Sequence, residues 1–174
     1  MGYPAHAREQ VRRRIVESAA RLFNRHGFTA VSIDEVMAGA GLTRGGFYSY
    51  FHSKSELYAE AIGQFVEQKR KVADAVAEAA DCASMIVRDY LSLQHHTEVE
   101  TSCPLIGLPS DLARNDKSIR MAQEIAVRMM IETFERGMAL CAGPARQRAL
   151  ALASLCVGGM VLARGVEDPS LADE

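Results

Sequence analysis

The feature that most constrains the fold is a pair of helix signals separated by a glycine turn, between residues 32 and 51. Ser32 can cap the backbone of a helix that begins after it, and Glu35 can reach back to complete a capping box. Apolar residues follow at helical spacing, and Gly41 provides a tight turn. Thr43 is the natural N-cap of the next helix. The spacing predicts a helix, a three-residue turn and a second helix.

Helices are also expected on both sides of this pair. Between residues 8 and 26 the apolar residues recur on one side of a helix, and Gly27 ends it after two basic residues. Ser53 and Glu56 form a second capping box, which opens a long fourth helix. Cations are disfavoured in a first helical turn, so we expect Lys54 to hold a phosphate together with free backbone amides; solvent exposure is the alternative.

The second helix of the pair, residues 43–51, has an unusual composition for a structural element. Gly45 and Gly46 each cost roughly 1 kcal/mol relative to alanine inside a helix, so we expect the backbone to approach a partner closely there. Phe47 and Phe51 lie one turn apart and can be buried. The side chains that remain on the outside can donate hydrogen bonds or are aromatic, and such a set suits contact with a DNA major groove. They are Thr43, Arg44, Tyr48, Ser49 and Tyr50.

Charge is divided unevenly along the chain. Residues 1–55 hold eight Lys and Arg against four Asp and Glu, a net charge of +4, whereas the remainder carries −6. A basic head on an acidic body indicates that one end meets a polyanion such as nucleic acid.

The strings SIDEVM (32–37), AGLTRGGFYSYF (40–51) and SKSEL (53–57) strongly resemble the TetR family of bacterial transcriptional repressors. The resemblance implies an all-α homodimer that binds a palindromic operator in double-stranded DNA. It also implies two domains: a helix-turn-helix DNA-binding domain over residues 1–55, and a helical domain over 56–174 that binds a small molecule, dimerises and releases the DNA.

The resemblance further implies roles for individual residues. Arg44 and Tyr48 would contact bases or the adjoining backbone, and Thr43, Tyr50 and Lys54 would hold phosphates. Burial of the two tyrosines in the head, and a plain surface charge at Arg44, are the alternatives. The expected DNA-binding set is Thr43, Arg44, Gly45, Gly46, Tyr48, Ser49, Tyr50 and Lys54.

In the body, helices are predicted at 82–98, 104–114, 117–142 and 145–165. Methionines are frequent there, and such adaptable side chains suit a pocket for a largely apolar ligand, although ordinary core packing explains the same residues. The candidate pocket residues are Met85, Tyr90, His95, Cys103, Met129, Thr133 and Phe134.

Cys103 precedes the predicted helix 104–114, where the helix dipole could lower the pKa of its thiol and make it a redox sensor. His95 and His96 are adjacent and point to different helix faces, which is poor geometry for a metal. Neither a catalytic set nor a cofactor motif is found, so we expect no enzyme. Two alternatives remain open: a small helical enzyme or metal/thiol sensor without DNA binding, and a dimeric scaffold that has lost it.

The apolar run 149–163 is shorter than a membrane span, and we interpret it as part of a buried helix. The resemblance places the last two helices in a dimer interface. Asp168 and Pro169 start a further helix that has barely begun by Glu174, which predicts a weakened or rearranged dimer. The N-terminus has no secretory signal, and the four cysteines form no CxxC pair, so a cytoplasmic protein with reduced thiols is expected.

Overall fold

The computed structural model describes residues 5–76, 82–107, 117–138 and 144–174, and every regular element among them is helical. The all-α expectation is thereby confirmed. In chain order the elements are α1 (Ala5–Ala30), α2 (Ile33–Gly39), the 3₁₀ helix η1 (Arg44–Ser49), α3 (Lys54–Val76), α4 (Cys82–Tyr90), α5 (Leu93–Thr97), the 3₁₀ helix η2 (Val99–Thr101), α6 (Lys117–Gly137), α7 (Ala145–Gly165) and α8 (Pro169–Asp173).

The head consists of α1, α2 and η1, and its predicted caps are present. The Ser32 hydroxyl accepts the backbone N–H of Glu35, and the Glu35 carboxylate accepts the backbone N–H of Ser32. Gly27 (φ 78°) and Gly41 (φ 68°) adopt left-handed backbone, as turn glycines should. After Gly27 the chain makes one more helical turn to Ala30, so α1 contains a kink.

The segments around these caps differ from the prediction in two places. Residues 44–49 form a 3₁₀ rather than an α-helix, and the Thr43 side chain makes no cap hydrogen bond. The predicted helix 82–98 is broken, because Ser92 leaves the helix and its hydroxyl caps α5 by accepting the His95 N–H at 3.1 Å. Of the predicted helix 104–114, residues 104–107 form turns and the rest lies outside the described residues.

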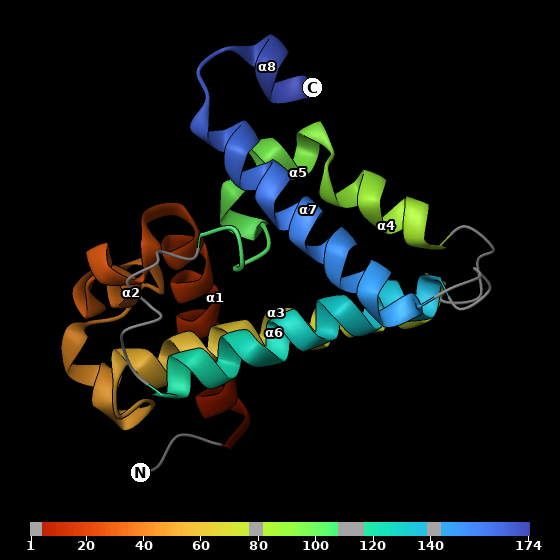
Figure 1. Ribbon diagram of the computed structural model, residues 1–174. Coiled ribbons are helices and arrows are strands. Elements are labelled where there is room, and N and C mark those ends of the chain that lie inside the picture. Colours follow the sequence, from red (N-terminus) through yellow and green to blue (C-terminus); the bar gives the residue numbers. More distant parts are fainter. Residues whose placement is uncertain (1–4, 77–81, 108–116, 139–143) are drawn as a thin grey trace.

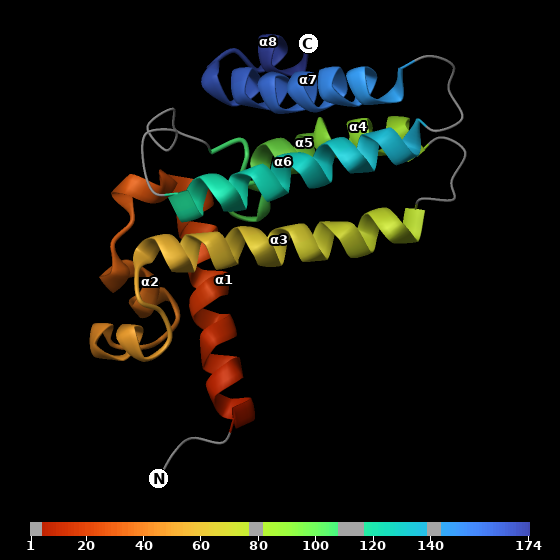
Figure 2. The ribbon, with the colours of Figure 1, turned by 60° about the horizontal axis from the view of Figure 1, so that its bottom comes forward.

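The body is a stack of long helices joined to the head by α3 (Figure 1). α3 begins beside α2 and runs alongside α6, while α1 crosses the start of α3 (Figure 2). α4, α5 and α7 lie on the opposite side of α6 from α3 (Figure 2). The buried residues between these helices are mainly apolar and include Ile119, Ala126, Ile131, Phe134, Cys156 and Met160. A single helix thus passes from the head to the body without interruption.

Only one side of α7 is covered within the chain, so the expected burial of this helix is partial in a single copy. Ala149, Cys156 and Met160 are buried, whereas Leu155 and Leu162 are 69% and 72% exposed. Among the described helices, α7 alone is long and apolar enough to cross a membrane, a property that covered helices of water-soluble proteins share. An apolar stripe of this kind requires a partner.

Candidate nucleic-acid interface and ligand cavity

Residues 43–51, here called the recognition segment, are anchored from behind by two aromatic rings. Phe47 and Phe51 are fully buried, with ring centroids 5.8 Å apart. Arg44 and Tyr48 point the other way, and Tyr48 is 62% exposed although it touches the Phe47 ring edge-on at 5.2 Å. The segment therefore presents its polar face to solvent.

Neither the backbone conformation nor the surrounding packing requires glycine at the two glycine positions of the recognition segment. Neither has a positive φ, and a Cβ added at Gly45 would meet no atom within 4 Å. At Gly46 it would meet only the Met37 Cε, at an ordinary 3.6 Å. At Gly45, which is exposed, a side chain is thus absent where the fold would tolerate one, whereas the Gly46 position faces the buried Met37. Close approach of a partner to the backbone explains this pattern.

The guanidinium of Arg44 is held by a weak surface contact. Its Nη1 donates to the Asp34 carboxylate at 2.9 Å, and both side chains are exposed. Exposed ion pairs of this kind contribute about 0–1 kcal/mol. A phosphate or a guanine edge can therefore take the place of the carboxylate at little cost.

Several head arginines are used inside the fold, which the sequence did not reveal. Arginines of α1 donate to the backbone carbonyls that follow α2 and η1: Arg8 to Ser49 at 2.8 Å, Arg12 to Tyr50 at 2.5 Å, and Arg14 to Ala40 at 2.6 Å. Arg12 also pairs with Glu60 and lies 4.3 Å from the centroid of the Phe51 ring. Tyr50, expected as a phosphate ligand, is half-buried with Arg8 over its ring. Some of the basic side chains of the head therefore hold the recognition segment in position.

The structure corrects the interpretation of Lys54 as a phosphate ligand. Its Nζ donates to the carbonyls of Phe28 and Val31, both at 2.8 Å, and lies 4.4 Å from the centroid of the Phe28 ring. Partial burial lowers the pKa of this ammonium. Two of its three donors are thus committed to the turn between α1 and α2, because the start of α3 packs against that turn.

Replacing Lys54 by methionine is expected to lower the free energy of unfolding by about 1–3 kcal/mol, because two carbonyls lose their donor. The salt dependence of DNA binding should not change. Thermal or urea unfolding and a salt titration of DNA affinity measure the two effects. Lys71→Met on the surface of α3, which removes only a 3.7 Å pair with Glu67, is the control and should be nearly neutral. A salt slope smaller by about 0.9 with unchanged stability would restore the phosphate role.

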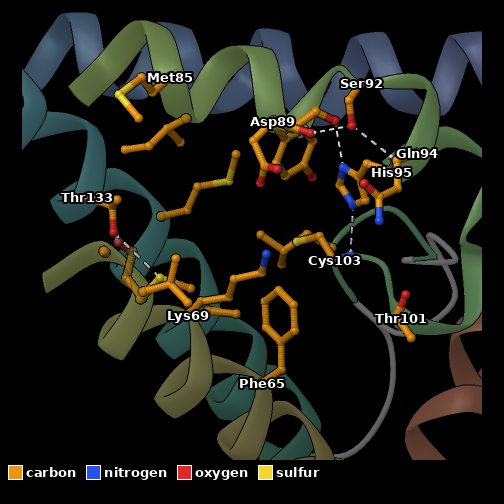
Figure 3. Close-up of a pocket in the computed structure, with 18 of the residues that line it drawn as sticks. Phe65, Lys69, Met85, Asp89, Ser92, Gln94, His95, Thr101, Cys103 and Thr133 are labelled. Carbon is orange, nitrogen blue, oxygen red and sulfur yellow. Dashed lines mark hydrogen bonds between the residues drawn. The ribbon is translucent and has the colours of Figure 1, made fainter. Parts of the chain in front are cut away.

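The body contains a cavity of about 490 Å³ between α3, α4, α5 and α6, a size suited to a small organic molecule (Figure 3). Six predicted pocket residues line it: Met85, Tyr90, His95, Cys103, Met129 and Thr133. Phe134 does not line the cavity, since it is fully buried in the core. Lys69 and Phe65 line the cavity from α3 and were not anticipated, because a lysine and a phenylalanine on an amphipathic helix carry no distinctive signal.

Cys103 has an environment opposite to the predicted one. It is buried, and among the described residues it starts no helix: residues 104–107 form turns. Burial raises the pKa of its thiol, so the neutral form is favoured. The expectation of a thiolate stabilised by a helix dipole is therefore wrong.

His95 fixes the wall of the cavity through both ring nitrogens. Nδ1 lies 2.6 Å from the Tyr90 carbonyl, and Nε2 lies 3.1 Å from the Cys103 backbone N–H. Nε2 must accept the Cys103 N–H, so the proton of the neutral ring belongs on Nδ1. Burial lowers the pKa of this histidine, which keeps it neutral. Among the described residues no cluster of His, Cys, Asp and Glu has the geometry of a metal site.

The cavity wall is connected directly to the head. The Asn24 side-chain amide donates to the carbonyls of Glu100 and Ser102, at 3.1 and 2.9 Å, and Arg25 pairs with the Glu100 carboxylate at 2.8 Å. Asn24 and Arg25 belong to α1, whereas Cys103 next to Ser102 lines the cavity. A change in the conformation of the cavity wall can therefore shift the position of α1.

Comparisons with known proteins agree with this arrangement. E. coli NemR in its reduced form superposes with a TM-score of 0.81 at 17% identity, over 94% of this chain and 92% of that one. A SmeT–triclosan complex superposes with a TM-score of 0.70 at 20% identity, over 94% and 84%. At these identities the likeness establishes the fold.

Similarity in sequence is concentrated in the head. The HTH-type transcriptional regulator YdgC of Bacillus subtilis is 35% identical over 65 residues, which are 37% of this chain but only 33% of that protein. Residues 15–61 match the family described as bacterial regulatory proteins, tetR family. The match of the helix-turn-helix head, the curated relatives and the shared all-helical fold together support a transcriptional regulator of the TetR family.

Proposed function

We propose that this regulator is a repressor that binds a palindromic operator through the recognition segment and is released by a small molecule bound in the body. Residues 1–55 bind DNA, and residues 56–174 bind the ligand and dimerise. The observation that carries the proposal is the open backbone at Gly45, beside the exposed Arg44 and Tyr48. Thr43 and Ser49, also exposed, complete the contact surface.

Gly45→Ala is expected to leave the free energy of unfolding unchanged or slightly higher, since the new methyl group meets no protein atom. DNA affinity should fall about 10- to 100-fold, because the methyl group obstructs a close-packed interface. A mobility-shift titration and a thermal unfolding curve measure the two effects. Gly63→Ala is the matched control: its Cβ also meets nothing, but it lies on α3 outside the recognition segment. Unchanged DNA affinity for Gly45→Ala would contradict the proposed interface.

A second copy of the chain is the proposed partner for the exposed stripe of α7. Two heads must be spaced by about 34–36 Å to reach successive major grooves of a palindrome, and a symmetric dimer provides such a pair. The stripe includes Leu155 and Leu162, which are seven residues apart and so face the same way. The same pairing would also cover the apolar surface that gives α7 its membrane-like composition.

The proposed ligand acts through the connection between cavity and head. SmeT, a structural neighbour, has been crystallised with triclosan, a precedent for a small molecule in this fold. In the proposed dimer the two heads adopt either a DNA-binding arrangement or a released one. A ligand shifts the equilibrium between them only if its affinity for the two arrangements differs. The segment around Ser102 is the proposed link between ligand and head, because it lies next to the cavity-lining Cys103 and its carbonyl accepts the Asn24 amide of α1.

A mobility-shift titration of the protein against the promoter beside its own gene tests the proposal. Saturable, sequence-dependent binding supports a regulator, whereas its absence favours a scaffold or a sensor without DNA binding. A sensor that uses a reactive thiol finds little support, because Cys103 is buried and its neutral form is favoured.

A further inference from the structure

Two cationic side chains act on the cavity wall at Cys103, and neither has a carboxylate partner among the described residues. Lys69 extends from α3 into the cavity toward Cys103 (Figure 3). The next two basic residues of α3 are both paired, Arg70 with Glu132 and Lys71 with Glu67, but Lys69 has no such pair. It lies 5.9 Å from the centroid of the Phe65 ring, one turn back on the same helix. The ammonium group of Lys69 is therefore available to a ligand.

The second cation, Arg164 of α7, is bound only to neutral acceptors among the described residues. Its guanidinium donates to the carbonyl of His95, to the carbonyl of His96 at 3.1 Å, and to the Ser102 hydroxyl at 3.2 Å. These bonds hold the segment that forms the cavity wall, and they leave the positive charge uncompensated. Burial lowers the pKa of Arg164, as expected for a cation without a counter-ion.

A hydrogen-bond donor at the same wall of the cavity also lacks a strong acceptor. The Tyr90 hydroxyl is buried and has no nitrogen or oxygen partner among the described residues; beside it lies the Cys103 thiol, which is only a weak acceptor. The Tyr90 ring packs edge-on against His95 with centroids 4.6 Å apart, so its position is fixed. A buried polar group without a partner is uncommon in a native fold and marks a place where a ligand or water completes the bonding.

The acidic residues of the cavity do not cancel this positive charge. Asp89 and Glu98 both line the cavity and both are exposed to solvent. The Glu98 carboxylate already accepts from the Gln94 amide at 3.1 Å and lies 3.4 Å from the Thr101 hydroxyl. The charges that act on the buried Cys103 thiol are those of Lys69 and Arg164, and both oppose the rise that burial causes in its pKa. Lys69 is exposed as these acids are, but the charges that act on the Cys103 thiol are cationic, so the potential at this wall of the cavity is positive.

The rest of the wall is apolar and adaptable, with Met85, Ile86, Met129 and Met130 around it. We propose that the cavity selects amphipathic organic anions, with a carboxylate, sulfonate or phenolate group between Lys69 and the Tyr90 hydroxyl and an apolar body against the methionines. This inference rests on the proposed ligand-responsive function and specifies the chemical class of the ligand.

Two fluorescent probes that differ in one acidic group test the proposal. 1-Anilinonaphthalene-8-sulfonate carries a sulfonate, and N-phenyl-1-naphthylamine has the same apolar skeleton without it. The full chain should bind the sulfonate more tightly. Lys69→Met should weaken sulfonate binding about 10-fold and leave the neutral probe unaffected, because a charged hydrogen bond is lost. Tyr90→Phe should weaken sulfonate binding about 5-fold without unfolding the protein, since the only group beside its hydroxyl among the described residues is the weakly accepting Cys103 thiol.

The control is Lys71→Met, which removes an equal charge from α3 outside the cavity and should leave both affinities unchanged. If the ratio of the two affinities is the same in Lys69→Met as in the wild-type chain, the anion preference is overturned, while the cavity remains a ligand site. If neither probe binds the wild-type chain, the ligand-responsive part of the proposed function fails as well.

Discussion

Phe47→Ala is expected to lower the free energy of unfolding by about 3–5 kcal/mol and to abolish operator binding. Phe47 is completely buried, and its ring packs on Phe51, so truncation leaves a cavity directly behind the recognition segment. Because the segment is a short 3₁₀ helix with few internal hydrogen bonds, it depends on this anchor for its shape. Urea unfolding followed by circular dichroism, together with a mobility-shift titration, measures both effects.

The adjacent residue provides the matched comparison. Tyr48→Ala removes a ring of similar size that is 62% exposed, so the loss of stability should stay below about 1.5 kcal/mol, the size of one ring-to-ring contact. DNA affinity should nevertheless fall by about 10-fold or more, because the exposed ring is proposed to touch the operator. Equal effects of the two substitutions on stability, or full DNA affinity in Tyr48→Ala, would show that the outward face has been assigned incorrectly.

The double change Leu155→Asp and Leu162→Asp is expected to convert a dimer into a monomer, because two charges would enter the apolar stripe of α7. Both leucines are exposed in the single chain, so the fold itself should tolerate the change. Operator affinity should fall by about 100-fold or more, since each head would then bind its half-site alone. Light scattering coupled to size-exclusion chromatography measures the mass, and mobility shift measures the affinity.

A control with the same chemistry is available on another helix. Met121 of α6 is 54% exposed and lies outside α7, so Met121→Asp should leave both the mass and the operator affinity unchanged. A wild-type chain that is monomeric in solution, or a double variant that remains dimeric, would contradict the proposal that α7 pairs with a second copy.

The local features of the head could be predicted because they depend on neighbours in sequence. The capping box of Ser32 and Glu35 needs only three residues, and the left-handed glycines Gly27 and Gly41 are favoured by their lack of a side chain. The burial of Phe47 and Phe51 follows from their spacing of one helical turn. The same reasoning missed the 3₁₀ geometry of η1, because a short helix of either kind has nearly the same apolar spacing.

The functions of the charged residues could not be predicted in this way. Lys54 is at a helix start in the sequence, but its partners Phe28 and Val31 come from a turn more than twenty residues earlier. Similarly, a count of head charges cannot distinguish Arg44, which faces solvent, from Arg12, which bonds to Glu60 and the Tyr50 carbonyl. Long flexible side chains find partners only after the helices have packed.

From its sequence alone this protein is a helix-turn-helix chain with an outward polar face, since capping, turn chemistry and apolar periodicity act over a few residues. The tertiary structure decided where the charge lies. It buried Cys103 instead of exposing a thiolate, and it brought the charges of Lys69 of α3 and Arg164 of α7 close to that thiol in the cavity wall. The physical reason is that the pKa of a thiol and the potential inside a cavity depend on burial and on charges close in space, which no spacing along the chain encodes.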